Sequence, residues 1–376
     1  MTAGGIFRVA VLRLVLAAAF VPALSAQNWT IQYFYDHDRE RLDILDLAFT
    51  SAQRGIALGA IYREDSSRDP KPVTLTTNDG GANWTLAPLK EQPRSLFFLN
   101  DSLGWMVTDR GVWRTEESGR AWRKINDQKK GLILRVWFLD PQHGFAVGYQ
   151  KTVLETRDGG RTWTPVAESQ TPAANPEFTA YTQIAFADTR RGMILGSSVP
   201  PRRNGGLPPW FAPERAAAQR QVPTLTLELE TLDGGVKWVP STVPLFGVVE
   251  NLKLLSTEGL MVFGFDQSFE WPSEVYRLDL TNGKSIRTFR ERTSRITDTL
   301  MFSGRRAFIA GVEPPGRLAS LPIPGKVQIY SSTDLNLWRK MDVNYKAVAG
   351  SVKLAGTDEQ HLWAATDTGM ILRMVP

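Results

Sequence analysis

Short apolar runs that end at clusters of turn-forming residues recur along most of the chain. Residues 73–76 read Val-Thr-Leu-Thr and residues 152–155 read Thr-Val-Leu-Glu, and each run is followed by an Asp-Gly-Gly sequence. Short runs bounded by Gly, Asp and Asn are typical of β-strands joined by tight turns. The pattern therefore predicts an all-β fold made of many short strands.

One turn motif repeats along the chain. Residues 77–84, 156–163 and 231–238 share the pattern Thr-x-Asp-Gly-Gly-x-x-Trp; residues 115–122 are a weaker copy and residues 332–338 a copy shortened by one residue. The Asp can accept hydrogen bonds from its own turn, the glycines supply positive φ, and the Trp buries a large ring. We expect these residues to hold the fold: Asp79, Trp84, Trp122, Asp158, Trp163, Asp233, Trp238, Asp334 and Trp338.

We call each copy of this turn motif a box. A second repeated unit lies upstream of the boxes. Residues 139–148 align with residues 99–107, 186–195 and 49–58, and each segment contains two apolar runs around a turn that closes on Gly. Together the two units predict four antiparallel strands per repeat, A to D in chain order. Four-stranded repeats of this kind are the blades of a β-propeller.

The spacing of the box tryptophans gives the number of blades. Successive box tryptophans from Trp84 to Trp338 lie 38, 41, 75 and 100 residues apart. The interval of 75 fits one blade with a long insertion, and the interval of 100 fits two blades. One of these two has lost its box, and Asn282-Gly283 offers a plain hairpin turn instead.

The last repeat lacks a fourth strand at the C-terminus. Near the other end of the sequence, Asn28-Trp29-Thr30 repeats Asn83-Trp84-Thr85 and is followed by a strand-like run. This N-terminal strand would complete the C-terminal blade and remove its open edge. We therefore predict a seven-bladed propeller over residues 27–376 as a single domain.

Residues 1–26 have the pattern of a signal peptide. Arg8 supplies a positive n-region, an uncharged apolar stretch follows Arg13, and residues 23–26 are small residues suited to cleavage. The uncharged stretch is far shorter than the roughly 20 residues of a membrane-spanning helix. We expect cleavage, export to the periplasm or the extracellular space, and a mature chain without a membrane span.

Composition excludes several classes of function. The chain has 44 Lys and Arg against 39 Asp and Glu, and loss of residues 1–26 would reduce this small excess further. A nucleic-acid-binding protein would need a concentrated basic patch. The absence of Cys rules out disulfides, a thiol nucleophile, a Cys-ligated metal and a lipid-modified N-terminal Cys. We predict no cofactor, no bound metal, no nucleic acid partner and a monomer.

These motifs resemble the Asp-box, or bacterial neuraminidase repeat, propellers. The segment from Val136 to Trp163 is most similar to the photosystem II stability and assembly factor-like family. That resemblance implies a seven-bladed propeller that binds assembly intermediates of membrane proteins without catalysing a reaction. The long insertions depart from the family pattern, and the motifs imply nothing about photosynthesis in the source.

Four insertions fall between strands B and C of their blades, so they should share one face of the disc. They cover residues 63–72, 199–223, 267–273 and 313–325. The largest combines arginines with aromatic residues, which dominate contact energy at interfaces. It is either a partner-binding loop or a Pro- and Gly-rich loop without a partner. The partner-binding candidates are Arg202, Arg203, Trp210, Phe211, Arg215 and Arg220.

The alternative to a binding scaffold is a glycan-processing hydrolase. Asp-box sialidases use an Arg cluster with a Tyr–Glu pair, and related xyloglucanases use paired carboxylates. The chain has one propeller and no Arg-Ile-Pro element before its first box, which favours the scaffold. Asp36-His37-Asp38 resembles a metal-ligand set in composition but fits a solvated turn better. We therefore predict no catalytic residues.

Overall fold

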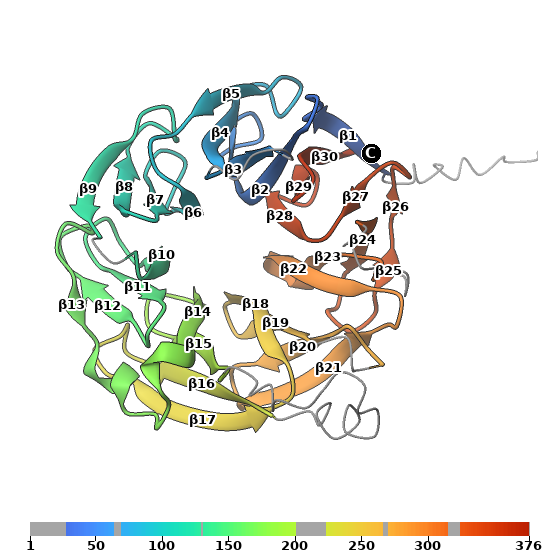
Figure 1. Cartoon of the computed structure of the whole chain (residues 1–376). Helices are drawn as coiled ribbons and strands as arrows, with labels where there is room; N and C mark the ends of the chain where they lie inside the picture. Colours follow the sequence, from blue (N-terminus) through green and yellow to red (C-terminus); the bar gives the residue numbers. More distant parts are fainter. Residues whose placement is uncertain are drawn as a thin grey trace, which may run out of the picture.

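A computed structural model describes residues 28–63, 69–128, 131–200, 223–265, 270–314 and 324–375. Seven antiparallel sheets surround one axis, with strand A of each blade innermost (Figure 1). This confirms the all-β, seven-bladed propeller. The candidates Arg202, Arg203, Trp210, Phe211, Arg215 and Arg220 lie outside the described residues.

The first four blades follow one another along the chain. Blade one contains β2 (Glu40–Phe49), β3 (Gly55–Arg63), β4 (Lys71–Thr77) and β5 (Thr85–Pro88). Blade two contains β6 (Pro93–Phe98), β7 (Gly104–Thr108), β8 (Gly111–Thr115) and β9 (Arg123–Asp127). Blade three contains β10 (Ile133–Phe138), β11 (Gly144–Gly148), β12 (Val153–Thr156) and β13 (Thr164–Pro165). Blade four contains β14 (Thr179–Phe186), β15 (Gly192–Ser198), β16 (Thr224–Thr231) and β17 (Val239–Leu245).

The remaining blades include two extra short strands. Blade five contains β18 (Val248–Leu255), β19 (Glu258–Gly264), β20 (Ser273–Asp279) and β21 (Lys284–Arg290). Blade six contains β22 (Arg295–Phe302), β23 (Arg306–Val312), β24 (Gly325–Ser332) and β25 (Arg339–Lys340), and β27 (Val348–Ala349) pairs with β24. Blade seven contains β28 (Val352–Gly356), β29 (Leu362–Thr366), β30 (Met370–Val375) and β1 (Asn28–Phe34), with β26 (Asp342–Val343) outside β1.

The N-terminal strand closes the ring as predicted. β1 pairs antiparallel with β30, and Trp29 lies opposite Met374 in this register. The Trp29 side chain is fully buried, and its Nε1 donates to Met341 Sδ at 3.4 Å. β1 is strand D of blade seven, and β26 pairs with its outer edge. Blade seven therefore has a short fifth strand outside its strand D.

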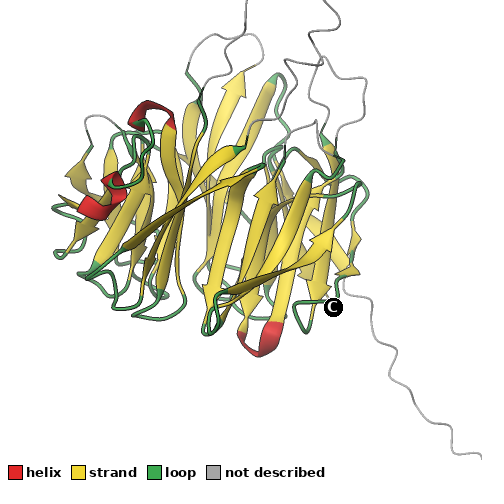
Figure 2. Ribbon diagram, turned by 90° about the horizontal axis from the view of Figure 1, so that it is seen from below, coloured by secondary structure: helices red, strands yellow, loops and turns green. Residues whose placement is uncertain are grey.

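The strands run between two faces of a disc (Figure 2). We call the face with the A–B and C–D turns the box face, and the face with the B–C loops and D–A connections the loop face. The 3₁₀ helix η3 (Ser303–Arg305) is an A–B turn, whereas η1 (Ala167–Gln170) and η2 (Pro176–Phe178) lie in a D–A connection. The B and C strands that flank the four insertions end and begin at the loop face, as the sequence predicted.

Neighbouring blades are joined by aromatic stacking. Trp105 on β7 stacks on Phe138 of the next blade, with centroids 3.6 Å apart, and donates its Nε1 hydrogen to Gly159 O at 2.9 Å. Trp363 on β29 stacks on Phe49 with centroids 3.4 Å apart and donates to Gly80 O at 2.9 Å. The seam between the last and first blades therefore has the same construction as an interface inside the chain.

Candidate functional site

The first box is a self-contained polar turn. Thr77 Oγ1 accepts the Gly81 N–H at 2.9 Å and donates to Asp79 Oδ1 at 2.8 Å. The Asp79 carboxylate also accepts the Asn83 backbone N–H at 2.9 Å and Asn83 Nδ2 at 2.7 Å. These bonds, led by that of the Asn83 side chain, lower the pKa of Asp79 to about 2. Gly80 and Gly81 have φ of 72° and 92°, which a residue with Cβ adopts at a cost.

The other boxes repeat this arrangement. Burial acts to raise the pKa of Asp158, but hydrogen bonds from Thr162 and Thr156 bring it down to about 2. The pKa values of Asp233 and Asp334 are lowered as well, first by backbone N–H groups. In each of these four boxes the Thr or Ser hydroxyl donates to the Asp. The carboxylates are thus occupied by their own turns.

The weaker box of blade two keeps the Thr contacts without the Asp. Thr115 Oγ1 accepts the backbone N–H groups of Glu117 and Gly119, both at 3.1 Å. Ser118 stands where the three Asp-Gly-Gly boxes have their first Gly and adopts φ of 56°. Trp122 is half-buried, as are Trp84, Trp163 and Trp338, whereas Trp238 is 2% exposed.

The loop face is hollowed between blades two and four. One hollow of about 700 Å³ has an apolar wall that includes Tyr149, Phe178 and Val199. Tyr149 is 47% exposed and Val199 53% exposed, so both present apolar surface to the solvent. The Arg94 guanidinium lies 5.6 Å from the Tyr149 ring centroid, which is cation–π distance.

A second hollow of about 750 Å³ adjoins the first, because Arg94 and Gly131 line both. We call the two together the loop-face groove. Arg94 Nη1 donates to Gly131 O at 2.7 Å and to Ile133 O at 2.9 Å, which fixes its side chain at the junction. The second hollow is otherwise lined by charged and amide side chains: Glu91, Asp109, Arg110, Lys124, Asp127 and Gln128.

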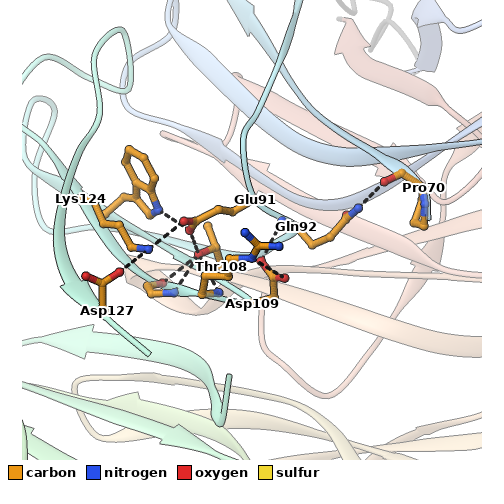
Figure 3. A network of polar contacts seen from close by, with 10 residues as sticks. Pro70, Glu91, Gln92, Thr108, Asp109, Lys124 and Asp127 are labelled. Carbon is orange, nitrogen blue, oxygen red and sulfur yellow. Dashed lines mark hydrogen bonds and ion pairs between the residues drawn. The ribbon is translucent and has the colours of Figure 1, made fainter. Parts of the chain in front are cut away.

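A polar network organises the second hollow (Figure 3). The Glu91 carboxylate accepts hydrogen bonds from Thr108 Oγ1 at 2.6 Å and Trp113 Nε1 at 2.9 Å. It also accepts Lys124 Nζ at 2.8 Å, and Lys124 contacts Asp127 at 2.6 Å. Although burial acts to raise the pKa of Glu91, these three donors lower it. This network joins the D–A connection, the B strand and strands C and D of blade two.

A buried lysine anchors the segment beside the first hollow. Lys151 is 3% exposed and has φ of 57°. Its Nζ donates to the backbone oxygens of Gln170 at 2.8 Å and Pro172 at 2.7 Å. Burial lowers the pKa of this ammonium group. The contacts hold η1 next to the B–C turn that carries Tyr149.

Sequence reasoning did not identify the residues of the loop-face groove. Arg94 and Glu91 lie where strand D leads into strand A, and Tyr149 lies in a B–C turn without an insertion. Their sequence positions, each beside a strand end on the loop face, were the available signal. The pattern of strands along the chain does not show that these strand ends meet across three blades.

A Tyr, a Glu and an Arg do meet in the described part of blade five, on its outer strands. Tyr276 Oη donates to Glu274 Oε2 at 2.5 Å, and Arg287 contacts the same carboxylate at 3.5 Å. These residues belong to the outer strands of blade five. Burial raises the pKa of Asp43, but Asp43 lies on inner strand β2 of blade one.

Within the described ranges, no three His, Cys, Asp or Glu side chains are grouped so that they could hold a metal. His37 packs on Tyr35 with ring centroids 4.6 Å apart, and His143 pairs with Glu155 at 2.9 Å. No helix in the part of the chain that the structure describes is long and apolar enough to cross a membrane.

Comparison with known proteins gives a consistent resemblance. Residues 121–199 match the family model of the photosynthesis system II assembly factor YCF48. The photosystem II assembly protein Ycf48 of Thermosynechococcus vestitus is 46% identical over 44 residues, which are 12% of this chain and 13% of that protein. The photosystem II assembly lipoprotein Ycf48 of Prochlorococcus marinus is 22% identical over 298 residues, or 74% of this chain and 80% of that protein.

The fold is shared with a solved structure of YCF48 bound to a D1 peptide. The two superpose with a TM-score of 0.55 over 92% of this chain and 100% of that chain, at 14% sequence identity. At this identity the likeness shows the fold. The sequence therefore resembles photosystem II assembly factors, and the architecture agrees with that resemblance.

Proposed function

We propose that this protein is a non-enzymatic, exported scaffold that holds a protein partner on its loop face. The observation that carries the proposal is the loop-face groove, where exposed Tyr149 and Val199 lie beside Arg94 and the Glu91 network. Apolar and aromatic side chains with a fixed Arg at their edge are what a protein interface requires.

The partner we propose is an extended segment of a membrane protein under assembly. Support comes from the resemblance to Ycf48, one solved form of which is bound to a D1 peptide. The groove extends over three blades, so it suits a segment of several residues better than a compact small molecule. Residues 1–26 would direct export and be removed, and the mature propeller would act as a monomer.

The insertion that contains Arg202, Arg203, Trp210, Phe211, Arg215 and Arg220 belongs to the same proposal. It follows Val199, which lines the groove, and precedes β16. We propose that these side chains add to the binding surface. Deletion of residues 201–221 should then reduce partner capture while the melting temperature stays nearly unchanged.

Site-specific photocrosslinking tests the proposed face. A benzophenone amino acid is introduced in place of Tyr149, and in a matched control in place of Leu337, which is 75% exposed on the box face. Crosslinking in the native envelope fraction should join one recurrent protein to the Tyr149 position and not to the Leu337 position. Equal crosslinking from both positions, or from the Leu337 position alone, would contradict the assignment.

A glycan-processing hydrolase is the alternative. The observation in its favour is Asp43, a partly buried carboxyl on an inner strand whose pKa is raised by burial. A raised pKa is what a general acid in glycoside hydrolysis needs. Turnover of fluorogenic glycosides that is abolished by Asp43→Asn would overturn the scaffold proposal. Arg41, whose Nε lies 2.7 Å from Asp43 Oδ1, favours the ionised carboxylate instead.

A further inference from the structure

One position of strand A is polar in all seven blades. It lies three residues before the residue that pairs with the start of strand B in blades one to four and seven, as Asp46 precedes Phe49, and four residues before it in blades five and six. In blades one to six a register shift immediately precedes it. The set comprises Asp46, Ser95, Arg135, Gln183, Asn251, Asp298 and Lys353. We call these residues the inner ring.

Three members of the inner ring use carboxylate or amide groups to join neighbouring inner strands. Asp46 Oδ2 accepts the Leu96 N–H of the next blade at 2.8 Å. Asp298 Oδ2 accepts the Leu354 N–H of its next blade at the same distance of 2.8 Å. Asn251 Nδ2 donates to Asp298 Oδ1 at 2.5 Å. These contacts between blades are internal to the fold.

Two further members donate to the next inner strand. Ser95 Oγ donates to Leu134 O at 2.8 Å, and Gln183 Nε2 donates to Glu250 O at 2.8 Å. Both acceptors are the residue just before the ring position of the next blade. Five of the seven positions are therefore satisfied by the neighbouring blade, which leaves Arg135 and Lys353 as the exceptions.

Arg135 and Lys353 are the two cations of the inner ring. In the described part of the chain, the side chain of neither residue makes a hydrogen bond or an ion pair. Lys353 instead lines a hollow of about 360 Å³ at the loop-face end of the axis, together with Arg295 and Glu250. Lys353 is partly buried in this wall, and the absence of a carboxylate in direct contact with its ammonium is unfavourable.

Arg295 is only partly satisfied. Its Nη2 contacts Glu250 Oε1 at 2.6 Å, while its Nε is buried without an acceptor among the described residues. The hydroxyl groups of Thr182 and Ser197 belong to the same lining. The hollow thus has two cationic donors and further polar groups at its wall.

We propose that Lys353 and Arg295 form a binding site for a single carboxylate in this axial hollow. The lining residues Glu250, Arg295 and Lys353 sum to one positive charge. This favours a monoanion over a phosphate, because a dianion would be left with excess charge. Asp367 accepts the Gly350 N–H at 2.8 Å and the Ser351 hydroxyl at 3.3 Å, so its carboxylate is engaged by these two donors at the rim.

The carboxylate has two sources in a polypeptide, a side chain of Asp or Glu and a free C-terminus. The hollow opens on the loop face, so a partner held in the loop-face groove is the natural donor; to this extent the inference rests on the proposed function. The groove would bind apolar side chains, and the axial hollow would bind an acidic group of the same segment.

Nuclear magnetic resonance of the lysine side chains tests the site without a partner. Sodium acetate is titrated into the full chain while the Lys353 ¹Hε–¹³Cε signal, assigned by Lys353→Met, is followed. Two short peptides then separate the sources, one with a single Glu and an amidated C-terminus and one without acidic side chains but with a free C-terminus. Saturable shifts are expected with acetate and with at least one peptide.

Variants supply the control. Arg295→Gln should weaken acetate binding about tenfold, the effect of losing one charge-assisted hydrogen bond. Lys253→Met, which removes a lysine of inner strand β18 outside the ring position, should leave binding unchanged. A linear shift without saturation, or equal affinity in Arg295→Gln, would overturn the site.

The outcome is separable from the proposed function. If acetate saturates Lys353 while no partner crosslinks at the Tyr149 position, the carboxylate site stands and the scaffold proposal fails. If the Tyr149 position captures a partner equally well in Lys353→Met and acetate does not bind, the scaffold stands and this inference fails.

Discussion

The two faces of the disc satisfy their polar groups in different ways. On the box face, Asp79 and Thr77 bond within one turn of seven residues, and the same contacts recur in three other boxes. On the loop face, Glu91 is bound by Thr108, Trp113 and Lys124 from different strands, and hollows remain between blades. Hydrogen bonds within one turn engage the box carboxylates in the fold, whereas hydrogen bonds between strands leave surface and charge at which a partner can bind.

The largest expected effect is on the free energy of unfolding, at the contact between the last and the first blade near the box face. Trp363→Ala should lower the free energy of unfolding by about 3–5 kcal/mol, because a fully buried ring, its stack on Phe49 and its bond to Gly80 are lost together. Trp113→Ala, a half-buried loop-face Trp, serves as the comparison and should cost less. Urea unfolding followed by circular dichroism measures both, and equal losses would remove the difference between the faces.

Removal of a box hydroxyl should lower the free energy of unfolding by a smaller amount. Thr77→Ala should cost about 1–2 kcal/mol, since it removes a buried hydroxyl that accepts the Gly81 N–H and donates to Asp79. Thr85→Ala changes an exposed Thr on β5 and should be nearly neutral. The same urea titration decides; if Thr77→Ala is as mild as the control, the box does not stabilise its turn through Thr77.

Acid should weaken the box face through its carboxylates. The pKa values of Asp79 and Asp158 fall to about 2 in the folded protein from an ordinary 3.8. A lowered folded pKa stabilises the fold above the unfolded value, and this contribution is lost as the pH falls from about 4 to about 2. The melting temperature should drop over that range, and the drop should shrink in the Asp79→Asn, Asp158→Asn double variant. If the melting temperature falls equally in the double variant, titratable groups other than these two carboxylates cause the acid sensitivity.

The smallest effect on stability is expected in the loop-face groove. Tyr149→Ser changes a side chain that is 47% exposed, so the free energy of unfolding should change by less than about 0.5 kcal/mol. Partner capture, measured by co-purification, should nevertheless fall strongly. Leu86→Ser, at 38% exposure on β5, is the matched control and should retain capture. Loss of capture in both variants would indicate a general effect of surface polarity.

Much of the fold could be predicted because its signals are local and repeated. A Thr, an Asp, two Gly and a Trp within eight residues specify one hairpin whatever surrounds it, and their spacing gave seven blades. The copy of Asn83-Trp84-Thr85 at Asn28-Trp29-Thr30 predicted ring closure, which β1 and β30 confirm. The role assigned to residues 202–220 stays a prediction, since they lie outside the described residues.

The groove could not be predicted in the same way. Arg94 and Tyr149 are 55 residues apart along the chain, and Tyr149 and Val199 are 50 apart. Nothing in their local sequence distinguishes them from other strand-end residues. Likewise, Lys353 differs from Gln183 or Ser95 only by lacking a partner in the next blade. Such differences depend on which strands become neighbours.

By itself, the sequence determined the strand pattern, the turns, the blade count and the closure, because each depends on contacts within one hairpin or on an exact repeat. The tertiary structure decided where polar groups are left over, because that depends on how the blades pack around the axis. In the first and the last box, a Thr or Ser hydroxyl donates to the Asp of the same turn, although the two boxes lie in different blades. Glu91, Arg94 and Lys353 acquire their roles only from the blade beside them.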